Sequence, residues 1–154
     1  MSVGAAERIV IVGGGPAAKA AADSYREAGG AGAVTILARE PDPPYERPPL
    51  SKDFLRRVSG REALPLAEPS WYRERAIELR TATEVAELDL GGPAVRTTAD
   101  EEIPFDRVLL ATGADPLVPP FPGADRGAVQ TVRRIGDSER LRELASGDRV
   151  LIAG

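Results

Sequence analysis

The feature that most constrains this chain is an apolar run that leads into a glycine-rich turn near its beginning. Residues 9–12 read Ile-Val-Ile-Val, and Gly-Gly-Gly-Pro-Ala-Ala follows directly. A continuous β-branched run is typical of a parallel strand that is buried on both faces. Pro16 suits the first position of a helix, where its missing N–H would have no partner. The pattern therefore predicts a strand, a tight turn and a helix.

The turn places Gly13, Gly15 and Ala18 at the spacing G-x-G-x-x-G/A. The first glycine permits the tight turn, the second lets the backbone approach a diphosphate, and the small third residue lets the helix pack closely on the strand. Free amides and the helix dipole favour an anion there. Glycines 29–30 end the predicted helix, and residues 34–37 form the next strand, so the unit fits the expected about 30 residues. A glycine turn without a ligand is the alternative.

Arg39 and Glu40 follow the second predicted strand. A carboxylate at this position can bind the diol of an adenosine ribose, which makes Glu40 the candidate. Arg39 could instead accommodate a 2′-phosphate, which would favour a single-nucleotide Rossmann dehydrogenase that binds NADP. Two solvated residues at a strand end are the third interpretation.

A proline-rich segment follows, with five prolines among residues 41–49. It must be extended or turning, because so many prolines exclude a helix. Arg47 and Lys52 lie on this stiff segment and suit a pyrophosphate or the electron-rich edge of a flavin. An exposed basic loop explains them equally well on physical grounds. Ser51 is expected to cap a short helix that ends at about residue 57.

The middle of the chain predicts a short helix and an antiparallel meander. Residues 69–77 are expected to be helical, with Trp71 and Ala76 buried, while Lys19 is expected on the exposed face of the first helix. Alternation and turn chemistry predict a meander whose strands lie at residues 84–88, 94–98 and 102–105, with a hairpin turn at residues 91–92. Residues 107–111 predict another buried strand.

The composition changes after residue 114. Four prolines among residues 115–122 indicate a linker. Residues 137–145 have helical periodicity, with Gly147 as a stop, and residues 149–154 repeat the opening pattern of an apolar strand that runs into glycine.

The composition excludes several classes of function. The chain has 154 residues, a formal net charge of −4 and no basic run, which argues against a nucleic-acid partner. Its apolar stretches are far shorter than the roughly 20 residues of a membrane span. Its start lacks the features of a signal peptide, so a cytoplasmic protein is expected. Cysteine and histidine are both absent, so no metal site and no catalytic side chain is predicted, and a cofactor must carry any chemistry.

Residues 45–52, Tyr-Glu-Arg-Pro-Pro-Leu-Ser-Lys, resemble the N-terminal part of FAD-dependent ferredoxin and rubredoxin reductases, which are related to apoptosis-inducing factor. Residues 71–79, 105–114 and 149–154 resemble the same family. The resemblance covers nearly the whole chain, and the proline-rich motif is its most specific element. The redox cysteine pair of the glutathione-reductase relatives is absent, in agreement with the cysteine count.

The resemblance implies FAD as the cofactor and assigns binding roles by position. Ribose binding would involve Glu40 at a place where Arg39 replaces the usual acid, and Lys52 would lie near the isoalloxazine. Val85 would meet the adenine through its backbone. The residues implied around the diphosphate and along the rest of the cofactor are Gly13, Gly15, Pro16, Ala17, Ala18, Arg47, Ala111, Thr112 and Gly113.

The implied fold is α/β. A Rossmann-like parallel sheet with helices and an antiparallel β-meander would form the FAD-binding domain over residues 1–114. Residues 115–123 would be a linker, and residues 124–154 the truncated start of an NAD(P)H-binding domain. The implied function is electron transfer from NAD(P)H through FAD to a small iron–sulfur carrier of the ferredoxin or rubredoxin type. Because the family continues past Gly154, the alternative is a non-catalytic truncated fragment or a dinucleotide-binding module.

Overall fold

The computed structural model describes residues 7–118, 120–124 and 129–145. The chain divides into two compact units. The sheet unit comprises Met1–Tyr45 and Pro65–Gly113, and the α3 unit comprises Glu46–Leu64 and Ala114–Gly154.

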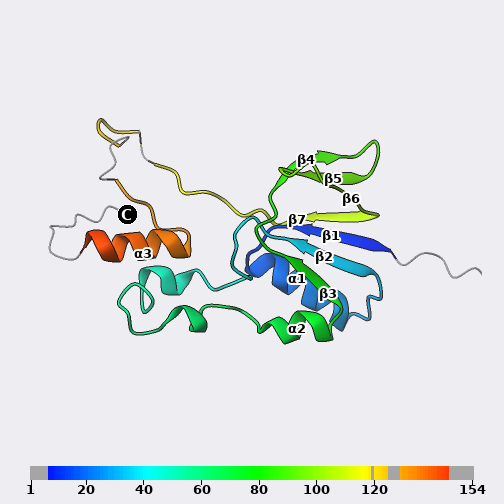
Figure 1. Cartoon of the computed structure of the whole chain (residues 1–154), viewed down its shortest axis with the longest axis horizontal. Helices are drawn as coiled ribbons and strands as arrows, with labels where there is room; N and C mark the ends of the chain where they lie inside the picture. Colours follow the sequence, from blue (N-terminus) through cyan, green and yellow to red (C-terminus); the bar gives the residue numbers. More distant parts are fainter. Residues whose placement is uncertain (1–6, 119, 125–128, 146–154) are drawn as a thin grey trace, which may run out of the picture. The chain divides into compact units, whose positions relative to one another are not determined.

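The sheet unit is built on a four-stranded parallel sheet (Figure 1). Its order is β3 (Ile77–Arg80), β2 (Ala33–Leu37), β1 (Arg8–Val12) and β7 (Arg107–Leu110). Helix α1 (Pro16–Glu27) connects β1 to β2, as the opening pattern predicted. Because this crossover returns the chain to the same end of the sheet, β1 and β2 run parallel. Both lie in the middle of the sheet.

The sheet separates two apolar cores, and the alternation of side chains along the strands explains them. On one face, Ile11, Val34 and Ile36 pack with residues of α1 and of α2 (Pro69–Glu74). On the other face, Val10 and Leu37 pack with residues of the meander and with the loop before β7. Helices therefore cover one face and the meander covers the other, as expected for the α/β fold (Figure 1).

The meander consists of β4 (Val85–Asp89), β5 (Ala94–Thr97) and β6 (Glu102–Pro104), paired antiparallel in that order. Its first turn is held by Asp89, whose Oδ1 accepts hydrogen bonds from the amides of Gly91 at 2.7 Å and Gly92 at 3.2 Å. The predicted meander and its hairpin turn are confirmed.

The predicted helix over residues 69–77 is too long. Helix α2 ends at Glu74, and Ile77 is already the first residue of β3. Ala76 was predicted to be buried, but it is exposed in a turn with a φ of 49°. Tyr72 is the buried residue instead, at 3% exposure, while Trp71 is half-buried. The positive φ reverses the chain, so the pattern beyond Glu74 belongs to a strand.

The helix predicted from Ser51 to about residue 57 is also wrong. The segment instead contains a 3₁₀ helix, η1 (Pro48–Ser51), followed by turns. The carbonyl of Pro49 accepts the amides of both Lys52 and Phe54, at 2.9 and 3.0 Å. This converging pattern closes the chain into turns and does not continue as an α-helix. A second short 3₁₀ helix, η2, spans Arg61–Ala63.

Strand β7 forms as predicted but is not buried. Leu109 and Leu110 are 42% and 59% exposed. The reason is its position, since within the described residues β7 is an edge of the parallel sheet. An apolar run predicts burial only where neighbours cover both sides.

In the α3 unit, helix α3 (Ile135–Leu144) confirms the predicted helix and begins two residues earlier. Ile135 is 3% exposed, and three residues of the earlier segment are buried with it in this unit: Leu50, Phe54 and Leu64. The predicted helix stop at Gly147 and the predicted strand over residues 149–154 lie outside the described residues.

Candidate dinucleotide-binding site

The turn after β1 is shaped by Gly13. Its φ is +138°, and an added Cβ would lie 2.1 Å from the carbonyl oxygen of Ala111. The Gly13 amide donates to the carbonyl of Leu37 at 2.9 Å, and the Ala111 amide donates to the carbonyl of Val12 at 2.8 Å. The turn is thus fixed between the ends of β2 and β7, and only glycine satisfies both the conformation and the space.

Gly15 differs from Gly13 in its backbone conformation and in the space around it. It is the N-cap of α1, with φ −104° and ψ −175°, and no atom lies within 4 Å of the position of an added Cβ. Within the described residues, the amides of Gly14, Gly15 and Ala17 have no hydrogen-bond acceptor. Pro16 has no amide to satisfy, and Ala18 is fully buried beneath the turn. Unpaired amides at a helix N-terminus with open space before them suit an anion.

The carboxyl ends of three strands meet at this edge of the sheet. Val12 pairs with Leu37 of β2 and with Leu110 of β7, so the residues that follow each strand lie side by side. The chain leaves β1 toward β2 on one side, and β7 lies on the other side, so the strand order reverses here. Ligands of open α/β sheets bind at such a switch point.

The carboxylate of Glu40 is held in place at the same edge. The hydroxyl of Tyr45 donates to Glu40 Oε2 at 2.6 Å, and Tyr45 itself is 2% exposed. Arg39 is exposed, and its Nη1 lies 3.8 Å from Glu84 Oε1. A carboxylate oriented by a buried hydroxyl is the better prepared of the two candidates for a ribose diol.

The other predicted residues of the sheet unit lie at strand ends. Ala111 is half-buried, while Thr112 and Gly113 are exposed and Gly113 has a φ of 72°. Val85 begins β4, pairs with Thr97 and precedes an irregularity in the register. The structure brings the residues that follow β1, β2 and β7 together at the sheet edge.

Arg47 and Lys52 belong to the α3 unit. Arg47 Nη1 donates to the carbonyl of Arg133 at 2.7 Å. Lys52 is exposed, and within the described residues its ammonium makes no hydrogen bond or ion pair. Its backbone is fixed, because its amide donates to Pro49 and its carbonyl accepts from Arg56.

Lys19 was expected on an exposed helix face, and this is wrong. Its ammonium lies 2.7 Å from Asp23 Oδ2 and 4.2 Å from the ring centroid of Trp71. Arg75 approaches the same ring at 4.6 Å and the same carboxylate at 3.6 Å. Lys19 therefore helps to join α1 to α2.

Two residues were missed by the sequence reasoning. Tyr45 orients Glu40, and its place directly before the proline-rich motif gave no sign of that contact. Ser138, fully buried, donates its hydroxyl to the carbonyl of Leu50 at 2.7 Å. No local pattern marks the Ser138 bond, because its hydroxyl reaches a residue 88 positions away.

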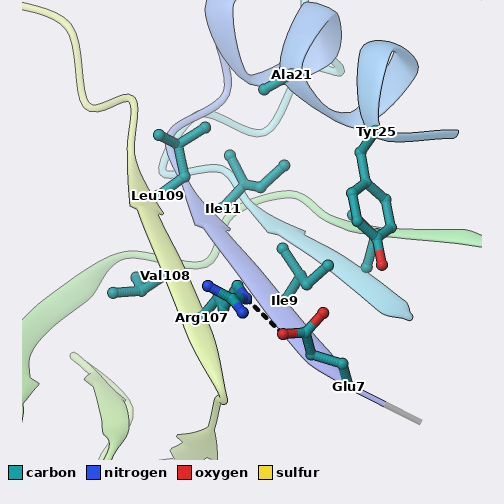
Figure 2. Close-up of a pocket in the computed structure, with 9 residues that line it drawn as sticks. Glu7, Ile9, Ile11, Ala21, Tyr25, Arg107, Val108 and Leu109 are labelled. Atoms are coloured by element: carbon teal, nitrogen blue, oxygen red, sulfur yellow. Dashed lines mark hydrogen bonds and ion pairs between the residues drawn. The ribbon is translucent and has the colours of Figure 1, made fainter. Parts of the chain in front are cut away.

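A cavity of about 310 Å³ opens elsewhere on the sheet unit, between α1 and the edge strand. Figure 2 shows Ile9, Ile11 and Leu109 directed toward α1, with the ion pair of Glu7 and Arg107 at one end. These two residues lie at the amino ends of β1 and β7, so the cavity is distinct from the glycine turn.

The described residues show neither of two further features. No three histidine, cysteine, aspartate or glutamate side chains gather there as they would around a metal ion. No helix in that part of the chain combines the length and apolar character that crossing a bilayer demands.

A glycine turn at the switch point of a parallel sheet defines an α/β domain of the Rossmann-like, dinucleotide-binding class. The comparison with protein families is consistent with this class. The family model for pyridine nucleotide-disulphide oxidoreductases matches residues 7–154. The chain belongs to this family.

The chain is similar to reductases of small electron carriers. Rhodocoxin reductase of Rhodococcus erythropolis is 35% identical over 147 residues, which are 95% of this chain and 34% of that protein. Rubredoxin-NAD(+) reductase of Pseudomonas putida is 35% identical over 147 residues, which are 95% of this chain and 38% of that protein. The chain thus spans little more than a third of the length of these relatives.

The chain is also similar to solved structures of such reductases. The chain matches the covalent complex of putidaredoxin reductase with putidaredoxin at a TM-score of 0.81 and 30% identity, over 90% of this chain and 34% of that one. It matches a ferredoxin reductase from Rhodopseudomonas palustris at a TM-score of 0.83 and 29% identity, over 89% of this chain and 34% of that one.

Proposed function

We propose that this chain provides the FAD-binding part of a flavoprotein reductase, which passes electrons from NAD(P)H through FAD to a small iron–sulfur carrier of the ferredoxin or rubredoxin type. The observation that carries the proposal is the glycine turn. Gly13 admits no side chain against Ala111, and Gly15 leaves open space before three amides without acceptors. The similarity to rhodocoxin and rubredoxin reductases supports the type of reaction.

The residues present suit a flavin dinucleotide. The unpaired amides around Gly15 would bind the diphosphate, and Glu40, oriented by Tyr45, would accept the ribose hydroxyls. Bound FAD would supply the capacity to accept a hydride and to release single electrons. The ammonium of Lys52 would stabilise negative charge on the flavin ring. The remaining proposed contacts are made by Pro16, Ala17, Ala18, Arg39, Arg47, Val85, Ala111, Thr112 and Gly113.

The test uses the polypeptide that the complete reading frame encodes. After purification and reconstitution with FAD, we expect visible flavin absorbance in stoichiometric amount. In the same protein, Lys52→Ala should lower the flavin midpoint potential, because a positive charge near the ring stabilises its reduced anionic form. Arg56→Ala is the matched control, since that side chain is 72% exposed and four positions away. A complete protein that takes up no flavin would refute the assignment.

Two alternatives give different results. A binding module without catalysis would bind FAD and show no NAD(P)H oxidation in the complete protein. A dehydrogenase that binds NADP through Arg39 would bind that nucleotide tightly and take up no flavin. Calorimetry with FAD and with NADP, followed by an assay of NAD(P)H oxidation with an iron–sulfur acceptor, separates the three.

The domain division is part of the proposal. Residues 1–114 would form the N-terminal part of the FAD-binding domain, residues 115–123 a linker, and residues 124–154 the start of an NAD(P)H-binding domain. The described residues from Thr112 to Pro122 are exposed, which favours cleavage in this stretch. A protease of broad specificity should cut first there, and mass spectrometry of the fragments checks it. A cytoplasmic location is also proposed, and fractionation of cells that express the protein tests it.

A further inference from the structure

The segment that carries Arg47 and Lys52 has little regular structure of its own. Residues 46–57 contain only η1 and turns, with Arg57 in a left-handed conformation at a φ of 61°. Its backbone hydrogen bonds join near neighbours, such as Lys52 to Pro49 and Arg56 to Lys52, so they close turns but do not fix the segment against the rest of the protein. The contacts of the segment with the element it packs against decide that. In the α3 unit that element is α3 and the residues just before it.

Two hydrogen bonds connect the proline-rich turn to α3 and to the residues just before it. Ser138, which is fully buried, donates its hydroxyl to the carbonyl of Leu50 at 2.7 Å, and Leu50 is 2% exposed. Arg47 Nη1 donates to the carbonyl of Arg133 at 2.7 Å. The bonds lie on either side of the two prolines, which are stiff already, so the turn is held at both ends.

A third set of contacts holds the residues after Lys52. Phe54 is 1% exposed, and the guanidinium carbon of Arg142 lies 3.9 Å from its ring centroid. Arg142 Nε also donates to the carbonyl of Leu55 at 3.3 Å. Lys52 therefore lies between two residues that α3 holds in place, Leu50 and Phe54.

The side chain of Lys52 contrasts with its backbone. Its amide and carbonyl are both hydrogen-bonded within the segment, while its side chain is exposed and its ammonium makes no hydrogen bond or ion pair within the described residues. A cation on a fixed backbone, with no partner in the described part of the protein, is prepared for a ligand.

We propose that α3 is a positioning element for the flavin, and that Ser138 is a positioning residue that acts through Lys52. By fixing the carbonyl of Leu50, Ser138 fixes the direction in which Lys52 leaves the turn. This inference rests on the proposed FAD-binding function. It links the segment after the linker to the electronic properties of the cofactor, although Ser138 itself touches no cofactor.

The experiment compares Ser138→Ala with Ser59→Ala in the complete FAD-loaded protein, each with and without Lys52→Ala. Ser59 is a half-buried serine of the same unit whose amide donates to Asp53, and within the described residues its hydroxyl makes no hydrogen bond. We expect Ser138→Ala to weaken FAD binding about tenfold and to lower the flavin midpoint potential, because Lys52 is then no longer held in one direction and must be ordered when the flavin binds. Ser59→Ala should change neither. In the Lys52→Ala background, Ser138→Ala should cause no further shift in potential.

Hydrogen exchange in the apoprotein tests the contacts between α3 and the proline-rich turn without the flavin. Ser138→Ala should increase exchange at the amides of Leu50, Lys52 and Phe54, while Ser59→Ala should not. If Ser138→Ala does not fold, Ser138→Cys gives the same comparison, since it nearly keeps the volume but is a weak donor.

The outcomes separate the inference from the proposed function. If the wild-type protein takes up no flavin, the proposed function fails, and the positioning role fails with it. If the wild-type protein takes up flavin but Ser138→Ala matches Ser59→Ala, only the positioning role fails. Equal shifts in potential with and without Lys52→Ala would also overturn it, because Ser138 would then act by another route.

Discussion

At the scale of the single residue, two glycines of one turn have different reasons to be glycine. Gly13 is required by the fold, since its φ of +138° and the carbonyl of Ala111 at 2.1 Å from an added Cβ leave no room for a side chain. Gly15 has an ordinary φ and open space. Within the described residues no atom lies within 4 Å of an added Cβ at Gly15, which supports the proposal that a ligand sets the requirement there.

This difference predicts different results for two alanine variants. Gly13→Ala should lower the free energy of unfolding by about 3 kcal/mol or more, because the strained conformation and the clash add. Gly15→Ala should lower it by only about 0.5–1 kcal/mol, the cost of alanine at an N-cap, yet weaken FAD binding at least about tenfold. Urea unfolding and calorimetry check the two quantities. Equal stability of the two variants would contradict the role given to Gly13.

At the scale of elements, a few long side chains join the ends of helices and strands. Arg26, in the last turn of α1, donates to four carbonyls: those of Gly30, Gly32 and Arg75 at 2.8 Å and that of Ala76 at 2.9 Å. It fixes the loop before β2 and the turn before β3 at once. The planar guanidinium suits this divergent set of acceptors.

Arg26→Ala should therefore lower the free energy of unfolding by about 3 kcal/mol, because four carbonyls lose a partner together. Arg26→Lys should recover little of the loss, since an ammonium does not reproduce the planar fork. Glu27→Ala, at the exposed neighbouring position, is the control. Urea midpoints measure all three, and a lysine variant as stable as wild type would contradict the account.

A second connection joins the start of β1 to the turn before β7. Arg8 donates to Asp106 through its side chain and also through its backbone amide, at 2.7 Å. These bonds lower the pKa of Asp106 from 3.8 to about 2. Because the pKa is lower in the folded protein, the bond stabilises the fold above about pH 4, and this stabilisation is lost as the pH falls to about 2.

Asp106→Asn should accordingly be less stable than wild type at pH 7 and should equal it near pH 2. Both side chains are about half-exposed, so added salt should reduce the difference at pH 7. Thermal unfolding from pH 7 to pH 2 measures this convergence, with Glu74→Gln as an exposed control. A difference that grows toward acid pH would reverse the sign and refute the assignment.

At the scale of the whole molecule, β7 leaves apolar surface uncovered. Within the described residues it is an edge of the parallel sheet, with Leu110 59% exposed. The chain spans little more than a third of the length of the relatives rhodocoxin and rubredoxin reductase. An apolar, unpaired edge is a template for association with another chain.

The 154-residue chain should therefore self-associate through this edge. Leu110→Lys should lower the associated fraction by about half or more, because an edge lysine opposes pairing. Leu90→Lys, at a position that is 73% exposed in the hairpin turn, is the control and should have little effect. Light scattering across a concentration series measures the fraction, and equal effects of both variants would show that the edge is not the contact.

The sequence by itself determined the elements whose signals are local. The β-branched run before Gly13 and the small residues after it predicted β1 and α1, and the paired glycines at residues 91–92 predicted the meander turn. Each of these features depends on residues within a few positions of one another, where period and turn chemistry act. The cofactor roles of the site residues remain predictions, which the glycine turn supports through its free space and unpaired amides.

The tertiary structure decided what distant residues do to one another. Burial of β7 depends on what lies beside it, and the boundary between α2 and β3 depends on a turn whose last carbonyl Arg26 holds. The bond from the Ser138 hydroxyl to the carbonyl of Leu50, across 88 positions, has no signature in any local pattern. Periodicity records which face of an element is apolar, whereas a specific side-chain bond exists only once packing has brought its two ends together.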